Sequence, residues 1–173
     1  MTDAMKADEI YHEEVPFTFI KYIIFVEAAL AAVFLALFFA QVSGGAIGEN
    51  PAPDWLFLML FALFAGIIAL LFSMRKMTIG ITPQAVNIYF GIFNRTIPFE
   101  SIESIHADSG PGIKYGGWGV RIFRDKKGWV LAYNTFGRPR IVLGLRRGRY
   151  GRFVFSTWNP DEIISIVERY KGG

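Results

Sequence analysis

Few residues in this chain have the types and spacing that covalent chemistry needs. The 173 residues include no cysteine, which excludes disulfides, iron–sulfur clusters, thiolate zinc sites and cysteine nucleophiles. The two histidines, His12 and His106, are far apart, and no nucleophile elbow accompanies either of them. Strand alternation puts His106 and Asp108 on one face, again without a nucleophile. We therefore predict no catalytic residue, no metal ligands and no cofactor, and expect that the protein is not an enzyme.

A glycine-dense segment, residues 108–119 (DSGPGIKYGGWG), matches neither of the common phosphate motifs. A phosphate-binding loop needs Gly-Lys followed by Ser or Thr at a helix start, whereas here Lys114 is followed by Tyr115. The dinucleotide spacing G-x-G-x-x-G fails at Tyr115 as well. We expect glycine to supply backbone freedom in a bent loop between strands.

The densest charge cluster is residues 145–152 (LRRGRYGR). Interleaved Arg and Tyr side chains can bind nucleic acid, but an anchored domain favours anionic headgroups or an acidic protein partner. Each basic residue near an anionic membrane is worth roughly 1 kcal/mol. A hairpin turn kept soluble by its charges fits equally well. The predicted lipid- or partner-binding residues are Arg146, Arg147, Arg149 and Arg152, and no nucleic acid is expected.

Two long apolar runs, residues 17–42 and 55–74, predict a transmembrane hairpin. A helix rises about 1.5 Å per residue, so roughly 20 residues cross a hydrocarbon core of about 30 Å. The break between the runs, residues 43–54, is rich in Gly and Pro and contains no Lys or Arg. Gly66, with Ala62 and Ala65 nearby, offers a small face for the first helix or for another protein.

Glu27 is the only charged residue between Tyr22 and Phe39. A carboxylate in lipid costs at least ~2.5 kcal/mol, so such groups usually face protein or water. Glu27 can serve as an ion or proton site or contact another subunit. It can also be protonated, extend to the interface, or meet Lys21 through water, because it lies only about two turns into the helix.

The charges on the two sides of Met74 are opposite in sign. Residues 1–74 carry two basic and eight acidic residues, a balance of −6, and residues 75–173 carry sixteen basic and seven acidic, a balance of +9. Arg75-Lys76 ends the second span, and the positive-inside rule places such a stop in the cytoplasm. We predict a plasma-membrane protein with both termini cytoplasmic, in which residues 1–16 are a solvated tail with one helical turn.

Residues 75–173 predict a β domain closed by a helix. Apolar and polar residues alternate from residue 77, and turns separate about seven short strands that we expect to be antiparallel. Asn159, Pro160 and Glu162 are typical of a helix start, and an apolar face runs from Ile163 to Tyr170. Such a helix would close the open end of a bent sheet.

Several local motifs resemble the prokaryotic pleckstrin-homology-like membrane proteins. Residues 95–105 (RTIPFESIESI) are similar to the segment with "Ile-Pro, then Ile-x-x-Ile" of those domains. Residues 118–121 (WGVR), 128–129 (GW) and 133–134 (YN) resemble the pattern of a small two-span subfamily of unknown function. Residues 155–162 fit its closing strand and helix. The resemblance covers about residues 55–173 and implies a β-barrel or sandwich capped by a helix, without catalytic residues.

These observations predict a non-enzymatic accessory or scaffold subunit. Its helices would pack in a larger membrane assembly or a homo-oligomer, in contact with membrane lipid, and its β domain would dock a partner. Glu27 and the aromatic residues Trp118, Trp129 and Trp158 are the predicted contacts. The alternatives are a sensor of anionic lipid that uses the basic turn, and a transport component that uses Glu27.

Overall fold

The computed structural model describes residues 9–45, 48, 50–110, 112–126 and 128–171. Parts of the predicted tail (residues 1–8), of the predicted loop 43–54 (46, 47 and 49) and of the chain end (172–173) lie outside the described residues. The chain forms two compact units. One comprises Thr18–Arg75, and the other combines Met1–Phe17 with Lys76–Gly173.

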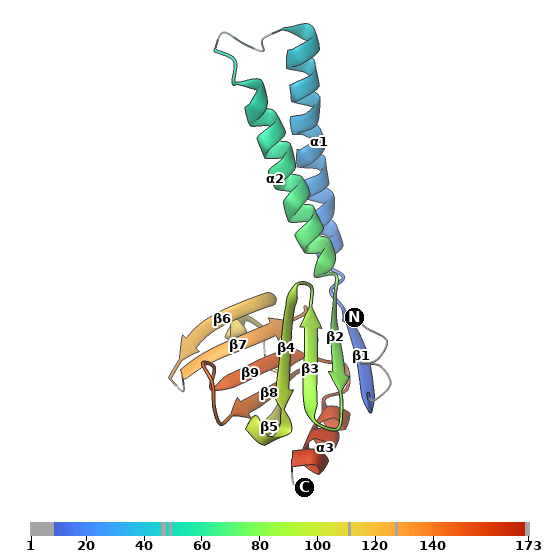
Figure 1. Cartoon of the computed structure of the whole chain (residues 1–173), viewed down its shortest axis with the longest axis vertical. Coiled ribbons are helices and arrows are strands. Elements are labelled where there is room, and N and C mark those ends of the chain that lie inside the picture. Colours follow the sequence, from blue (N-terminus) through green and yellow to red (C-terminus); the bar gives the residue numbers. More distant parts are fainter. Residues whose placement is uncertain (1–8, 46–47, 49, 111, 127, 172–173) are drawn as a thin grey trace. The chain divides into compact units, whose positions relative to one another are not determined.

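The first unit is a hairpin of two helices, α1 (Ile20–Gly44) and α2 (Asp54–Ser73) (Figure 1). Only Ile20, Ala31 and Gln41 are buried in α1, and no residue is buried in α2. A core helix of a soluble protein would be mostly buried instead. Both helices are long and apolar enough to cross a membrane.

Contacts in the middle of α1 and near its end hold the two helices of the hairpin together. Phe34 stacks on Phe64 with 5.5 Å between ring centroids. At the end of α1, the Gln41 side-chain amide donates to the Ala52 carbonyl (2.7 Å) and to the Asp54 carboxylate (2.5 Å). The prediction that the two apolar helices form a hairpin of adjacent, antiparallel helices is therefore confirmed. Gly66 has open space around its Cα, so its small face does not pack on α1.

The second unit contains two β-sheets whose strands run across one another (Figure 1). The four-stranded sheet has the order β1-β2-β3-β4 and is antiparallel throughout. Its strands are β1 (Tyr11–Pro16), β2 (Lys76–Ile81), β3 (Ala85–Phe90) and β4 (Phe93–Pro98). The five-stranded sheet has the order β5-β8-β9-β7-β6. Its strands are β5 (Ile102–Asp108), β6 (Gly119–Asp125), β7 (Gly128–Asn134), β8 (Arg140–Leu145) and β9 (Arg152–Ser156).

The solvated tail predicted for the N-terminal residues is wrong for Tyr11–Pro16. This segment is strand β1 and pairs with β2 in the register Tyr11↔Ile81 to Pro16↔Lys76. Glu13 and Val15 point inward and are buried, while His12 and Glu14 are exposed. A charged residue at an inward position hid the period-two pattern. In the sequence, the helical hairpin is thus inserted between β1 and β2, two strands that are neighbours in one sheet.

The all-antiparallel arrangement is also wrong at one strand pair. Strand β9 lies between β8 and β7, antiparallel to β8 and parallel to β7. The short turn after β8 returns the chain beside β8 as an antiparallel hairpin partner, and this placement brings β9 alongside β7 in the same direction. The five-stranded sheet is therefore mixed, and the domain combines an antiparallel sheet with a mixed one.

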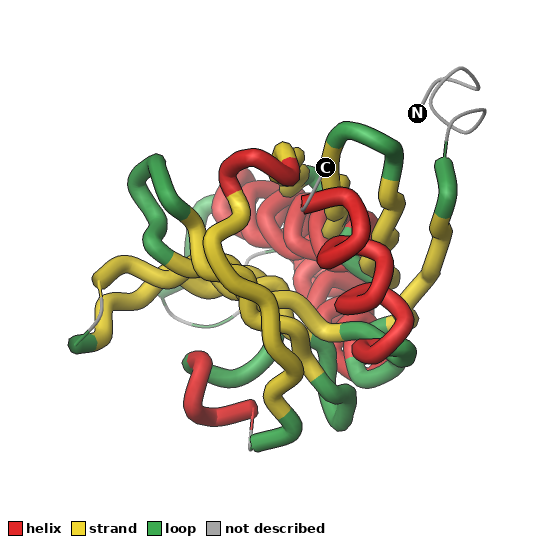
Figure 2. Tube along the Cα trace, turned by 90° about the horizontal axis from the view of Figure 1, so that it is seen from below, coloured by secondary structure: helices red, strands yellow, loops and turns green. Residues whose placement is uncertain are grey.

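Helix α3 (Pro160–Lys171) packs on β5 and on the short turn η2 (Phe99–Ser101). Figure 2 shows it as the red helix that leads to the C-terminus. The α3 residues Ile163 and Val167 are fully buried, and Tyr170 of the same helix stacks on Phe99 with 5.6 Å between ring centroids. The predicted closing helix and its first residue, Pro160, are confirmed. After residue 100, the alternating pattern predicts strands at residues 102–107, 118–123, 128–134, 140–145 and 152–156, and the observed strands β5 to β9 match these to within about two residues.

Candidate functional site

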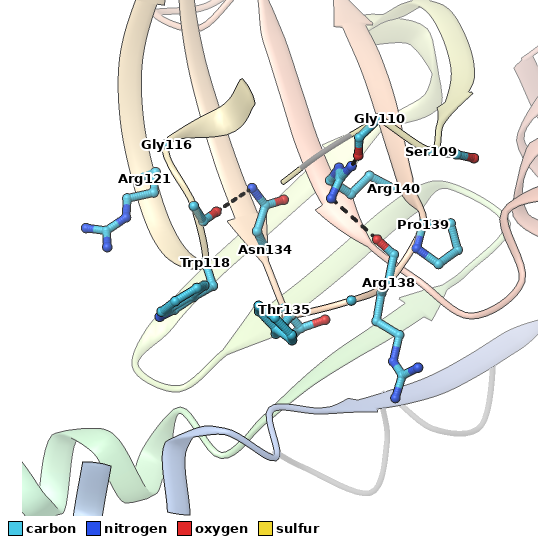
Figure 3. Close-up of a pocket in the computed structure, with 13 residues that line it drawn as sticks. Ser109, Gly110, Gly116, Trp118, Arg121, Asn134, Thr135, Arg138, Pro139 and Arg140 are labelled. Atoms are coloured by element: carbon cyan, nitrogen blue, oxygen red, sulfur yellow. Dashed lines mark hydrogen bonds between the residues drawn. The ribbon is translucent and has the colours of Figure 1, made fainter. Parts of the chain in front are cut away.

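A cavity of about 1030 Å³ opens beside the ends of β7 and β8 (Figure 3). Its described lining comes from three segments, residues 109–110, 116–121 and 134–140. Three arginines line it, and no aspartate or glutamate is among the described lining residues. We call this cavity the arginine pocket; the side chains that define it are Arg121, Arg138, Arg140, Asn134, Thr135, Trp118 and Phe136.

Asp108 shapes one wall of the arginine pocket. Its carboxylate accepts hydrogen bonds from the Gly110 N–H (2.8 Å), the Lys114 ammonium (3.0 Å) and the Tyr115 hydroxyl. These hydrogen bonds fold the segment after Asp108, which includes the short turn η3 (Gly112–Tyr115). In this fold the Gly110 carbonyl accepts a hydrogen bond from Arg140. Burial raises the pKa of Tyr115, and its bond to Asp108 raises this pKa further. Gly116 and Gly117 then take φ values of 77° and 88°, as the predicted bent loop requires.

Arg140 is the most deeply buried charge in the pocket, with 3% of its surface exposed. Its guanidinium donates to two backbone carbonyls, those of Arg138 (3.4 Å) and Gly110, and lies 5.5 Å from the Tyr115 ring centroid. No ion pair among the described residues includes Arg121, Arg138 or Arg140. Asp108 lies opposite Arg140 in the β5–β8 strand pair, but its carboxylate bonds to Gly110, Lys114 and Tyr115 rather than to the guanidinium. A buried charge without a direct counter-charge is costly. The pocket therefore favours an anion.

The other two arginines are more accessible than Arg140. Arg138 is half-buried and stacks on Trp158, with 3.3 Å between the guanidinium carbon and the ring centroid. Arg121 is exposed, and its stem passes beside Gly116, where a Cβ would lie 3.6 Å from it. Together they extend the positive wall from the interior to the mouth of the pocket.

Four lining side chains carry a polar atom that is covered and has no partner among the described residues. These atoms are Asn134 Oδ1, Thr135 Oγ1, Arg138 Nε and Arg140 Nε. Buried polar groups in proteins nearly always have a partner, so four exceptions in one wall call for an explanation. Their concentration here singles out the arginine pocket among the described cavities.

Two exposed aromatic rings form the rim of the pocket. Trp118 is 38% exposed and Phe136 is 63% exposed, and they meet edge to face at 5.5 Å. Trp118 lies on the side of the pocket away from Arg140 (Figure 3). The pocket thus combines positive charge inside with flat apolar surface at its mouth, an arrangement suited to binding a small organic anion.

Asp108 makes the pocket wall sensitive to acid. Burial alone would raise the pKa of Asp108, but the hydrogen bonds from Tyr115, Gly110 and Lys114 outweigh it and the net pKa is lowered. The carboxylate therefore stabilises the fold fully above its ordinary pKa of 3.8, and this contribution is lost as pH falls towards the lowered value.

We expect Asp108→Asn to lower the melting temperature at neutral pH, and we expect the melting temperatures of the variant and the wild type to converge in acid. Thermal unfolding across pH tests this; an equal difference at every pH, or an equal effect of Glu103→Gln on the same strand, would contradict it.

The three predicted tryptophans lie in different surroundings. Trp118 lines the arginine pocket, and Trp158 lies against Arg138 and donates its backbone N–H to Glu13 (2.5 Å). Trp129 is 42% exposed on β7 and is not part of the pocket lining. The structure thus places Trp118 in the arginine pocket and Trp158 against Arg138, which also lines that pocket, and leaves Trp129 apart.

The predicted basic turn is only partly available. Arg146, Arg147 and Arg149 are exposed between β8 and β9, but Arg152 begins β9 and pairs with the Asp125 carboxylate. Arg149 also lies 5.8 Å from the Tyr150 ring centroid. A second cavity of about 530 Å³ next to this turn includes Arg146 together with Glu100. The four arginines therefore do not form one positive surface.

Glu27 is partly buried in α1, and its Oε2 atom is covered without a hydrogen-bond partner among the described residues. No direct ion pair joins it to Lys21, whose ammonium instead lies 5.0 Å from the Tyr22 ring centroid. A contact of Glu27 with another subunit, an ion or a proton stays a prediction.

Sequence reasoning missed Arg121, Arg138, Arg140, Asn134 and Thr135. Arg138 stands in a Gly-Arg-Pro turn, and Arg140 opens an apolar strand, positions where arginine is normally solvated. The available signal was the aromatic and basic composition of residues 133–140. Comparisons of the whole chain with protein-family models, with curated proteins and with solved structures give no match.

Proposed function

We propose that this protein is a membrane-anchored, non-enzymatic binding module whose β domain, of pleckstrin-homology-like type, holds a small anion in the arginine pocket. The observation that carries this proposal is Arg140, a guanidinium with 3% exposure and no carboxylate partner among the described residues. An anion supplies the missing counter-charge, and guanidinium groups bind oxyanions through charge-assisted hydrogen bonds.

The hairpin serves as the anchor in this proposal. Pairing of β1 with β2 requires the segments before and after the hairpin to lie on the same side of a membrane, as two spans demand. The loop of residues 43–54 has no Lys or Arg, whereas Arg75 and Lys76 follow α2. This charge distribution supports a cytoplasmic β domain and a plasma-membrane location.

The chemistry of the pocket supports binding rather than catalysis. The described lining offers guanidinium, amide and hydroxyl groups and aromatic rings. His106 is exposed on β5 and does not line the pocket, so the described lining lacks a general base. The proposal therefore assigns the pocket to recognition.

Anion binding by the full chain in nanodiscs of zwitterionic lipid tests this function. Titration calorimetry with inorganic phosphate, sulfate and citrate should show binding that weakens as salt increases. Arg121→Gln combined with Arg138→Gln should weaken it by at least about thirtyfold, since each of the two lost charge-assisted contacts costs about 1 kcal/mol or more. The control, Arg147→Gln with Arg149→Gln, removes the same charge outside the pocket. Equal loss in both double variants, or no binding of any anion, rules the proposal out.

A second function, an accessory subunit of a membrane assembly, is favoured by one observation. The covered and unpartnered Oε2 atom of Glu27 would gain a partner from a polar group on another membrane helix. Native mass spectrometry after gentle extraction should then show a complex that Glu27→Leu dissociates and Glu27→Gln largely keeps. Complexes of the same size and abundance in both variants would exclude a role for Glu27.

A further inference from the structure

We infer that the ligand of the arginine pocket is a nucleoside phosphate, a step that rests on the proposed binding function. The phosphate would lie at Arg138 and Arg140 in the interior, and the base would stack on Trp118 and Phe136 at the rim. Three independent features of the pocket support this division.

The first feature is the charge and its depth. Arg140 is nearly fully buried and uses its terminal nitrogens on backbone carbonyls, while Arg138 and Arg121 carry the positive wall outward. Backbone carbonyls orient a guanidinium without neutralising it. A phosphate group offers both the charge and several acceptor oxygens, so it matches this wall better than a neutral ligand.

The second feature is a hydrogen-bond acceptor beside these donors. The Asn134 side-chain NH₂ donates to the Gly117 carbonyl (3.0 Å), and a carbonyl can only accept, so the Asn134 orientation is fixed. Its Oδ1 atom is consequently an acceptor, and it has no partner among the described residues. A bare phosphate ion in its ionised form has little to donate to it. A ribose hydroxyl or a base amino group is a donor of the kind that this atom lacks, and to reach it the covering wall of the pocket has to move.

The third feature is the rim. Trp118 and Phe136 keep 38% and 63% of their surface exposed although they line the cavity. Every nucleobase has a flat face, and stacking on an aromatic side chain does not require a particular base. The cavity of about 1030 Å³ is at the upper end of small-ligand pockets and has room for an organic phosphate rather than for a lone ion.

The test compares probes on the full chain in zwitterionic nanodiscs by titration calorimetry. The probes are AMP, GMP, ribose 5-phosphate, adenosine and inorganic phosphate, together with discs that contain phosphatidylglycerol. We expect AMP or GMP to bind at least about tenfold more tightly than ribose 5-phosphate, since a stacked base adds that much affinity. Trp118→Leu should remove most of this advantage, while Trp129→Leu, the same change at an exposed tryptophan outside the pocket, should not. Arg140→Lys and Arg138→Gln should weaken every phosphate probe.

Four other results would overturn the inference, and each points to a different conclusion about the pocket. Equal binding of ribose 5-phosphate and the nucleotides removes the base from the ligand but leaves the anion-binding function intact. Binding confined to discs with phosphatidylglycerol assigns the pocket to a lipid headgroup. Nucleotide binding that is equally affected by Trp118→Leu and Trp129→Leu places it elsewhere. Failure of every probe, inorganic phosphate included, rejects the proposed function as well.

Discussion

Replacing Glu13 by alanine should lower the free energy of unfolding of the β domain by about 3–5 kcal/mol. The Glu13 side chain is buried, with 7% of the residue exposed, and its carboxylate accepts three hydrogen bonds. The donors are the Tyr11 hydroxyl (2.6 Å), the Thr157 hydroxyl (2.6 Å) and the Trp158 backbone N–H (2.5 Å). Alanine leaves the fully buried Thr157 hydroxyl and the Trp158 N–H without an acceptor.

The neighbouring residue provides a matched control. Glu14→Ala removes a carboxylate from the outward face of β1, where it pairs with Lys76 at 2.5 Å while both side chains are about half exposed. Exposed ion pairs of this kind contribute about 0–1 kcal/mol. Hydrogen exchange of the β1 and β2 amides in the full chain measures both effects. Similar exchange in the two variants would show that Glu13 does not fasten β1 to the segment that follows β9.

Phe153→Ala should destabilise the β domain by about 3–5 kcal/mol through the cavity it leaves. Phe153 has no exposed surface and lies on β9, between β8 and β7. Its ring meets Tyr133 edge to face at 5.1 Å and stacks near Phe155 at 5.8 Å. Because these neighbours belong to a closely packed sheet, they cannot move in to fill the space.

The same substitution at an exposed ring separates burial from the loss of an aromatic side chain. Phe136→Ala removes a ring with 63% exposure and should cost less than about 1 kcal/mol in stability. Denaturant titration followed by the fluorescence of the β domain compares the two. A cost for Phe136→Ala that equals that for Phe153→Ala would mean that the core around β9 is not the main source of stability.

Much of the architecture follows from patterns that the sequence displays openly. Helices α1 and α2 follow from long apolar runs, and β7, β8 and β9 follow from short apolar segments between glycine- and charge-rich turns. Strand β1 was not predicted because Glu13, a charged residue, occupies an inward position. Its hydrogen-bond donors Thr157 and Trp158, which stabilise the buried carboxylate, lie 144 and 145 residues away in the sequence. A local sequence pattern around Glu13 contains no information about hydrogen-bond donors that far along the chain. The parallel pairing of β7 with β9 likewise depends on strand order, which periodicity does not encode.

The arginine pocket was less predictable than the fold. Trp118 was identified as an exposed aromatic residue, but Arg140 looked like an ordinary strand-end charge. Its burial depends on the Gly110 carbonyl, which Asp108 and Tyr115 hold in place through the fold of the glycine-dense segment. Such an arrangement appears only when segments about 30 residues apart meet.

Insertion of the hairpin between β1 and β2 also governs the order in which the domain can be completed during synthesis. Strand β1 leaves the ribosome before its neighbour β2, which emerges only after both apolar helices, and its donors at Thr157 and Trp158 emerge later still. Contacts between segments so distant in sequence form slowly, because the intervening chain must be ordered first. Until residue 158 is available, the Glu13 carboxylate lacks two of its three donors, so we expect β1 to be weakly held in a nascent chain. Strand β1 is thus fully bonded only after both helices and strand β9 have been made.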